Sequence, residues 1–359
     1  MRIGIVSYWF NRGQGVVARQ LRSALDQLGH ESFVLARPTK ETFRQPRTVE
    51  RGDVWGQEGV TAATAFEIPA GEYLEWASET GIEVLFSDQN YQFAELAELR
   101  RRGIRTIGRF VWERFSDEHV EPAKQAFDVV YSLTLAEQER YATMGIDSPY
   151  LRWGCHPSLS EVTPQRDGET VTFFFHGGLL GKRKPIDEIL EAFSRTDDPN
   201  LRLLIKAQVE RKLGKLRKRQ QADPRIELVL EDLPTAEHLQ LFANSDVCLT
   251  PSRWEGLGLH LYEALAFGMP IITNDKPPMT ELVEDDFNGL LVASHQDGQA
   301  NSGIPAYAPD VDELTTAIQR LGDAELRRRL AQGALATARD RSWDRTVEDV
   351  GRVLDLAKT

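Results

Sequence analysis

Short apolar runs alternate with longer amphipathic stretches along the whole chain. The runs have the length and the β-branched and aromatic content of buried strands, and they are bounded by turn residues. We predict strands at residues 2–8, 83–87, 106–111 and 127–133 of the first half, and at 172–177, 201–207, 225–231, 245–251, 270–275 and 289–294 of the second. Such alternation is typical of parallel sheets covered by helices, so the fold class is α/β.

The alternation starts afresh near residue 170, after a polar segment with three prolines at 149–170. Because 359 residues are long for one core, we expect two α/β domains in tandem, residues 1–155 and 156–340. Residues 341–359 have apolar positions at helical spacing and are expected to form a terminal helix, with packing back on the N-terminal domain as its candidate position. Residues 38–70 and 294–309 are predicted to be long loops, either functional lids or surface excursions.

Composition narrows the function classes. The formal charge of −12 argues against a general nucleic-acid binder. The N-terminus lacks the order of a signal peptide, and no apolar run approaches the ~20 residues of a membrane span, so we expect a cytoplasmic protein. Cys155 and Cys248 lie far apart in apolar contexts, which favours buried thiols over a disulfide or a metal pair.

A local basic segment departs from this acidic balance. Residues 100–114 contain six arginines and one glutamate. Two interpretations stay open: peripheral contact with acidic lipid or with an anionic acceptor, which would place the protein at the inner face of a membrane, or a solvated helix end.

Two glycine-rich segments lie before predicted helices, where backbone N–H groups and the helix dipole favour anions. Gly13 and Gly15 follow the first strand, but the third glycine of a dinucleotide fingerprint is missing, so a tight turn without a ligand is an equal alternative. The second segment reads EGLGL, in which Glu255 and the glycines fit a loop before the helix at 259–267. Glu263 lies inside that helix, eight positions after Glu255.

A third segment, FHGGLLGKRKPIDEIL, places Lys182, Arg183 and Lys184 just before a helix that begins at Pro185. Cations normally avoid this end of a helix dipole, so the cluster indicates a bound polyanion. Six of the ten lysines lie between Lys182 and Lys218. For residues 208–219 a solvated helix face is favoured over a binding surface, and Arg183 and Lys184 are the stronger candidates.

These motifs carry a resemblance. Residues 251–292, PSRWEGLGLHLYEALAFGMPIITNDKPPMTELVEDDFNGLLV, resemble the donor-site signature of retaining glycosyltransferases of family 4, whose E-x7-E spacing is met by Glu255 and Glu263. Residues 176–193 resemble the phosphate-binding stretch of that family, and residues 309–318 with the late SWD resemble its closing helices. The resemblance implies the GT-B fold of two facing Rossmann-like domains, with a nucleotide-sugar in the interdomain cleft.

The resemblance also implies roles for single residues. Glu263 would bind the ribose hydroxyls, Glu255 would lie against the donor sugar, and Lys184 with Arg183 would neutralise the leaving diphosphate. The backbone amides of Gly256 to Gly258 would contact the sugar and the diphosphate. The remaining predicted donor contacts are Leu257, Leu259, Gly178 and, from the first domain, Gly15.

The implied reaction moves a hexose-type sugar with retention of configuration to a glycan, lipid-linked or small-molecule acceptor, without metal, cofactor or nucleic acid. Because negative charge grows on the departing diphosphate, fixed amides and cations there lower the barrier. Enzymes of this kind lack an accepted nucleophile, so Glu255 is placed in the catalytic set with Lys184 and Arg183 but not as a nucleophile.

Two departures from the family pattern leave alternatives open. Leu179 occupies the place of a common arginine, and the usual histidine after a middle strand of the first domain is missing. Acceptor or sugar contacts are instead predicted at Asp88, Gln89, Arg109 and Trp112, against the alternative that these residues cap strand ends. The rival functions are a non-catalytic nucleotide-sugar-binding module, an epimerase or a phosphorylase of the same fold.

Overall fold

The computed structural model describes residues 1–40, 48–166, 168, 170–209 and 213–357. The chain divides into two compact units. Unit 1 comprises Met1–Trp153 and Trp343–Thr359, and unit 2 comprises Gly154–Ser342. The C-terminal segment therefore belongs to the same unit as the N-terminus.

Unit 1 contains a six-stranded parallel sheet in the order β3-β2-β1-β4-β5-β6. The chain winds outward from β1 in both directions, which is the doubly wound Rossmann arrangement. The strands are β1 (Arg2–Tyr8), β2 (Glu31–Arg37), β3 (Val60–Ala62), β4 (Val84–Asp88), β5 (Arg105–Arg109) and β6 (Val129–Val130). Neither β2 nor β3 was among the predicted strands: β2 opens with the polar pair Glu31 and Ser32, and β3 has three residues.

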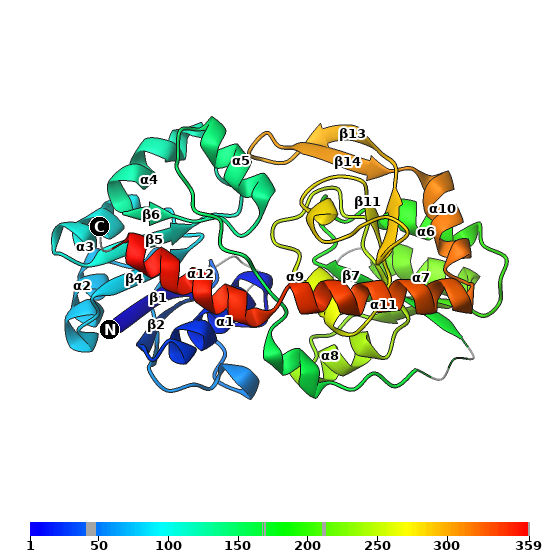
Figure 1. The fold of residues 1–359 in the computed structure, drawn as a ribbon, viewed down its shortest axis with the longest axis horizontal. Coiled ribbons are helices and arrows are strands. Elements are labelled where there is room, and N and C mark those ends of the chain that lie inside the picture. The colour runs from blue at the N-terminus through cyan, green and yellow to red at the C-terminus, as the bar shows by residue number, and fades with distance from the viewer. Residues whose placement is uncertain (41–47, 167, 169, 210–212, 358–359) are drawn as a thin grey trace. The chain divides into compact units, whose positions relative to one another are not determined.

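Helices cover this sheet, and the last of them comes from the other end of the chain. The helices are α1 (Gly13–Gln27), α2 (Ala70–Thr80), α3 (Phe93–Arg101), α4 (Val120–Ala126), α5 (Leu135–Thr143) and α12 (Trp343–Leu356), with 3-10 turns at Asp53–Trp55 and Asp117–His119. Figure 1 shows α12 in red against α1 in blue, and the two helices are in contact. The buried residues of α12 include Trp343, Val350, Val353 and Leu354, and Trp343 lies seven positions, or two helical turns, before Val350, which explains the amphipathic pattern of the segment.

Unit 2 repeats the same winding. Its parallel sheet has the order β12-β11-β10-β7-β8-β9, so the chain again winds outward from its first strand. The strands are β7 (Val171–Gly178), β8 (Leu201–Ala207), β9 (Ile226–Val229), β10 (Val247–Leu249), β11 (Ile271–Asn274) and β12 (Gly289–Val292). The helices are α6 (Ile186–Ser194), α7 (Leu213–Ala222), α8 (Thr235–Ala243), α9 (Leu259–Ala266), α10 (Val311–Arg320) and α11 (Ala324–Asp340), with 3-10 turns at Pro157–Glu161 and Met279–Glu281.

The prediction of a long loop at residues 294–309 is wrong. This segment forms an antiparallel hairpin of β13 (Ser294–Gln299) and β14 (Pro305–Pro309), coloured orange in Figure 1. The strand SHQDGQ carries no apolar run, so its pairing depends on backbone hydrogen bonds that hydrophobic periodicity does not signal.

The core of unit 2 explains why its central strands read as continuous apolar runs. Phe173, Phe174 and Phe175 of β7 are each fully buried, because helices cover both faces of the sheet. Cys248 is buried within β10, Cys155 is partly buried, and both are free thiols, as expected. Among the described residues, no helix is both long enough and apolar enough to span a bilayer.

Candidate functional site

The candidate site of unit 2 lies where the winding of its sheet reverses. β7 has β8 on one side and β10 on the other, so the loops that follow β7 and β10 leave the carboxyl edge in opposite directions. Open parallel sheets bind ligands outside this edge, at the point of reversal. Residues 179–185 follow β7 and residues 250–258 follow β10, and together they contain most of the predicted donor contacts.

Tight turns determine where the cationic residues of the first loop lie. Gly178 and Leu180 both adopt positive φ, at 51° and 45°, and the amide of Leu180 donates to the carbonyl of Gly177 over 2.8 Å. Leu180 is buried, whereas Leu179 is 58% exposed. The loop then returns toward the sheet, because the amide of Lys184 donates to the carbonyl of Gly181 over 3.0 Å.

The two loops meet in an ionic cluster in which Lys184 and Glu255 are buried and Arg183 is partly exposed. The ammonium group of Lys184 lies 2.9 Å from the hydroxyl of Ser252 and 3.4 Å from the carboxylate of Glu255. The guanidinium of Arg183 forms an ion pair with the other oxygen of Glu255. The loop backbones are also joined, since the amide of Arg253 donates to the carbonyl of Arg183 over 2.9 Å. The structure thus brings together Arg183, Lys184 and Glu255, the three residues predicted as the catalytic set.

Neighbouring charges oppose the effect of burial on the pKa values in this cluster. Burial alone would raise the pKa of Glu255, but Arg183 and then Lys184 hold the pKa of this carboxyl well below its usual range. Burial lowers the pKa of Lys184, and the nearby Glu255 opposes the shift. Two cations face one carboxylate, so the cluster has an excess of positive charge that suits an anionic ligand.

Three polar residues that were not singled out from the sequence extend the cluster. The imidazole Nε2 of His260 lies 2.7 Å from the hydroxyl of Thr250 and 4.0 Å from the Glu255 carboxylate. Thr250 in turn lies 3.5 Å from Ser252. Burial and the neighbouring Lys184 lower the pKa of His260 to about 3, so its ring is neutral at neutral pH. Their position in the sequence could have identified them as site residues, because all three flank the EGLGL motif next to the end of a predicted strand.

The EGLGL turn presents the start of α9. Gly258 adopts φ 72° as the N-cap of α9, a left-handed conformation that glycine reaches without strain. The amide of Gly256 is 3.3 Å from the carboxylate of Glu255, and the side chain of Leu257 is buried. Leu259 is the first residue of the helix, so the turn and the helix N-terminus together offer backbone donors.

Glu263 lies one turn inside α9. No hydrogen bond or ion pair joins its carboxylate to any part of the chain that the structure describes. Burial raises its pKa to about 7. The thiols of Cys155 and Cys248 are close enough for Glu263 to affect their pKa values. Glu263 is therefore separate from the Glu255 cluster and has acceptor oxygens available for a ligand.

In unit 1 the structure gives a packing reason for Gly15. A Cβ atom at this position would lie 2.3 Å from the carbonyl oxygen of Phe10 and 3.2 Å from the ring of Trp55. A Cβ atom at Gly13, by contrast, would have no neighbour within 4 Å among the described atoms. The close approach within the β1–α1 turn thus accounts for Gly15 without a ligand.

The predicted acceptor residues gather at the carboxyl edge of β4 and β5. The guanidinium of Arg109 lies 3.2 Å from the carboxylate of Asp88, and these side chains are 2% and 9% exposed. Burial raises the pKa of Asp88, and Arg109 opposes the shift. Gln89 follows with a φ of 50° and is buried, with its Nε2 unpaired within the described chain. Trp112 lies in the turn after β5, and its backbone amide bonds to the buried Glu137.

The basic segment at residues 100–114 is largely paired. Arg100 bonds to Asp128 over 2.7 Å, and Arg101 and Arg102 share Glu98. Arg105 donates to the carbonyl of Ala357, just after α12, and Arg109 is buried. The six arginines therefore do not form one exposed patch, and the solvated helix end is the better description of residues 100–102.

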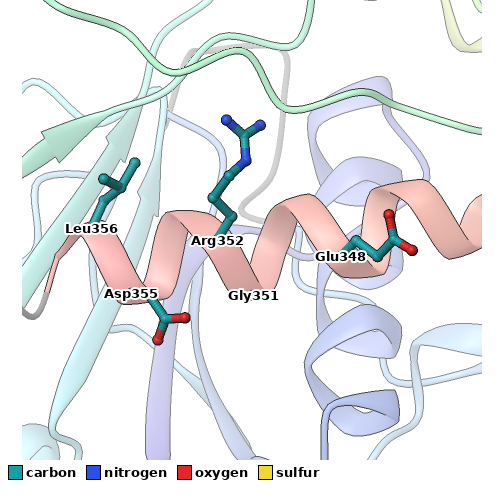
Figure 2. A pocket seen from close by; sticks show the side chains of 5 residues that line it. All are labelled: Glu348, Gly351, Arg352, Asp355 and Leu356. Atoms are coloured by element: carbon teal, nitrogen blue, oxygen red, sulfur yellow. The ribbon is translucent and has the colours of Figure 1, made fainter.

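Outside the two sheet edges, the described residues offer a surface hollow but no metal site. A surface hollow of about 530 Å³ lies along α12, lined by Glu348, Gly351, Arg352, Asp355 and Leu356. Figure 2 shows that Arg352, Asp355 and Glu348 point in different directions from this single helix, so they do not converge on a ligand. Across the described ranges, no group of three or more His, Cys, Asp or Glu side chains is arranged to hold a metal ion.

Parts of the chain are similar to known proteins. Residues 161–333, slightly under half of the chain, match the family model of glycosyl transferases group 1. Over 198 residues the chain is 27% identical to the UDP-N-acetylglucosamine--peptide N-acetylglucosaminyltransferase GtfA subunit of Streptococcus pneumoniae serotype 4, which covers 54% of this chain and 39% of that protein. The alignments with the next four curated relatives span less than a quarter of their lengths.

Two solved structures show the fold. Sucrose-phosphate synthase from Thermosynechococcus elongatus is similar with a TM-score of 0.75 at 17% identity, over 99% of this chain and 98% of that one. The Anabaena protein HepE, in complex with UDP and glucose, is similar with a TM-score of 0.70 at 13% identity, over 99% of both chains. The chain thus has the two Rossmann-like units of the GT-B fold, and the family match with these likenesses supports a GT-B glycosyltransferase.

Proposed function

We propose that this protein transfers a hexose-type sugar from a nucleotide-diphosphate sugar to a hydroxyl acceptor, with retention of configuration and without a metal ion. The observation that carries the proposal is the ionic cluster of Arg183, Lys184 and Glu255 at the reversal point of the unit 2 sheet. It lies inside the segment that matches glycosyl transferases group 1.

The diphosphate of the donor would bind to this cluster. Arg183 and Lys184 supply two positive charges, and the turn at Gly256 to Gly258 with Leu259 supplies backbone donors at the N-terminus of α9. Glu255 pairs with both cations, so an arriving diphosphate would share them with it. As the bond from sugar to diphosphate breaks, these fixed charges stabilise the negative charge that develops on the leaving group.

The rest of the donor fits the remaining predicted contacts. The unpaired carboxylate of Glu263 would accept hydrogen bonds from ribose hydroxyls, Gly178 would border the diphosphate, and Gly15 stays a predicted contact from the first unit. A UDP-sugar is the first donor to test, because the name of the S. pneumoniae relative specifies UDP-N-acetylglucosamine and the Anabaena structure holds UDP and glucose.

The acceptor would be a hydroxyl of a glycan, a lipid-linked sugar or a small molecule, in the cytoplasm or at the inner face of a membrane. Asp88, Gln89 and Trp112 are its proposed contacts. The unpaired buried oxygen of Asp88 and the unpaired amide nitrogen of Gln89 support this role, since such groups are satisfied when a ligand or water binds. Arg109 would act through Asp88, which it holds in place.

Thermal unfolding with nucleotides tests the donor assignment. UDP, GDP and ADP and their common sugar conjugates are added to the wild-type protein and to Glu263→Ala. A ligand at 100 times its Kd adds about 2.7 kcal/mol of stability. We expect a shift for one nucleotide class that is lost in Glu263→Ala. An equal shift in both proteins would contradict the role of Glu263, and no shift with any donor would contradict the proposed function.

One observation favours a second candidate, a non-catalytic nucleotide-sugar-binding module. Leu179 is exposed at the place where the resembled family commonly has an arginine, so one cation of the leaving-group site is missing. This candidate predicts donor binding without either hydrolysis or transfer of the sugar.

A further inference from the structure

The β13–β14 hairpin is bonded to the loop that holds the ionic cluster. The amide of Tyr307 in β14 donates to the carbonyl of Arg253 over 2.9 Å. The side-chain amide of Asn274, at the end of β11, donates to the carbonyls of both Ser252 and Tyr307, over 3.0 and 3.1 Å. The hairpin and the loop are therefore joined by backbone and side-chain bonds on one side of Arg253.

The side chain of Arg253 makes a second connection. Its guanidinium pairs with the carboxylate of Asp297 in β13 at 2.5 Å and also donates to the Asp297 carbonyl. The Arg253 side chain is 19% exposed and that of Asp297 is 57% exposed. The Arg253 side chain therefore extends from the loop to the hairpin, where the carboxylate of Asp297 with which it pairs is exposed to solvent.

Arg253 is also one residue away from the cluster. Ser252 accepts the 2.9 Å hydrogen bond from Lys184, and the backbone amide of Arg253 donates to the carbonyl of Arg183. A continuous set of bonds therefore runs from Asp297 through Arg253 to both cations. A shift of the hairpin would move the groups that hold Lys184 and Arg183.

We propose that Arg253 is a positioning residue for sugar transfer, which the β13–β14 hairpin holds through Asp297 so that the 250–258 loop keeps Lys184 and Arg183 aimed at the donor diphosphate. This inference rests on the proposed function. Arg253 needs no contact with the substrate in this role, because it acts through Ser252 and the Arg183 carbonyl.

The Arg253–Asp297 ion pair should affect the rate of the reaction and the stability of the fold to different extents. An ion pair whose carboxylate lies at the surface, as that of Asp297 does, contributes about 0–1 kcal/mol to folding. Backbone bonds along the hairpin and at Tyr307 remain when the pair is removed, so the fold should persist. A displacement of a catalytic group by about 1 Å is worth up to about 100-fold in rate. Loss of the pair should therefore reduce turnover much more than stability.

The test compares Asp297→Asn and Arg253→Lys with a matched control, Asp286→Asn. Asp286 forms exposed ion pairs with Arg320 and Arg329 at 2.8 and 3.3 Å in the same unit, away from the 250–258 loop. The readouts are hydrolysis of UDP-glucose, measured as UDP release, the Kd for UDP, and the thermal midpoint. We expect kcat to fall about tenfold in both variants while the Kd for UDP stays within twofold and the midpoint matches the control. Asp297→Glu should recover most of the lost turnover.

Two outcomes would overturn the inference: turnover in Asp297→Asn equal to that in Asp286→Asn, or a joint loss of turnover, UDP affinity and thermal midpoint, which would indicate a purely structural pair. Hydrogen exchange of the 250–258 amides separates this failure from failure of the proposed function. If wild-type protein neither binds nor hydrolyses UDP-glucose, faster exchange in Asp297→Asn than in the control would still establish the coupling of hairpin and loop, and unchanged exchange would refute it.

Discussion

The ammonium group of Lys184 lies 3.4 Å from the carboxylate of Glu255, and both side chains are only 5–6% exposed. Removing such charges from water is costly, and a buried ion pair seldom repays that cost in folding free energy. A charged ligand that binds at the same place explains the pair better, because the free energy used to bury the two charges then contributes to ligand binding and catalysis. Several expectations depend on this relationship and on the residues around it.

Replacing Lys184 by alanine should reduce turnover more than donor affinity. The lysine faces the charge that develops on the leaving diphosphate, and one fixed donor at such a position is worth about 3 kcal/mol, or roughly 100-fold in rate. Steady-state hydrolysis of the donor gives kcat, and ligand-induced thermal shifts give affinity. Lys182→Ala is the control, because Lys182 is exposed in the same loop. Wild-type turnover in a folded Lys184→Ala protein would refute the catalytic assignment.

Donor affinity should rise with pH through the titration of Glu263. Burial raises the pKa of this carboxyl to about 7, so it is mostly protonated at pH 6 and ionised at pH 8. Because the ionised form accepts hydrogen bonds from ribose hydroxyls best, affinity for UDP-glucose should increase up to about tenfold over this range. UDP-glucose suits the titration, since its diphosphate has no proton to lose there. The pH dependence of the affinity should vanish in Glu263→Gln. If it persists in this variant, another titrating group is responsible for it.

The same group gives a stability prediction of opposite sign. In the unfolded chain Glu263 loses its proton near its ordinary pKa of 4.5, whereas in the folded chain it does so near 7. The unfolded state therefore binds fewer protons between these values, and the Glu263 contribution to the free energy of unfolding should fall as pH rises through this window. Urea unfolding of wild type and Glu263→Gln at pH 5 and pH 7 measures the difference, and equal pH dependence in both would contradict the raised pKa.

Leu179→Arg should increase turnover. Leu179 is 58% exposed in the loop that carries Arg183 and Lys184, at the place where the resembled family commonly has an arginine. An added cation beside the diphosphate should accelerate donor hydrolysis about tenfold, which corresponds to roughly 1.4 kcal/mol of further stabilisation of the leaving group. Leu179→Gln removes the exposed leucine without adding charge and should leave the rate unchanged. Equal rates in the two variants would show that charge at this position does not affect the reaction.

Gly15→Ala should destabilise the fold by about 1–3 kcal/mol, the usual cost of inserting a methyl group into a packed site. The new Cβ atom would meet the carbonyl oxygen of Phe10 at 2.3 Å. Gly13→Ala lies in the same helix with open space around its Cβ position and should be neutral or slightly stabilising. Urea unfolding of the two variants measures the contrast. Equal midpoints would mean that the turn relaxes without cost.

The main residues of the site could be predicted because the resemblance to family 4 glycosyltransferases assigned Lys184 and Glu255 to one donor site. The apolar runs of β7 and β10 were evident in the sequence, and the structure shows how they bring these residues together, since parallel strands place their carboxyl ends at one edge. Lys184 and Glu255 are 71 residues apart and still meet at this edge. Spacing alone gave no indication that Ser252 and Thr250 would join them, since a hydroxyl after a strand is common in any loop.

Other features depend on partners that periodicity cannot identify. Arg109 at a strand end looks the same in sequence whether it faces solvent or, as found, is buried against Asp88 with Glu137 close enough to affect its pKa. The strand of the hairpin that pairs with Arg253, β13, has the polar sequence SHQDGQ, so hydrophobic patterning missed it. These two cases share a cause, because both are determined by contacts between segments distant in sequence.

The contact of α12 with α1 has a consequence for the order in which the chain can fold during synthesis. Residues 1–153 of unit 1 are synthesised before unit 2, but α12 is made only after the whole of unit 2. Until then the apolar face that receives Trp343, Val350 and Val353 has no cover, and Arg152 lacks its buried carboxylate partner Asp349. Unit 1 therefore stays incomplete while unit 2 is synthesised, and a variant that lacks α12 would leave that surface open to aggregation.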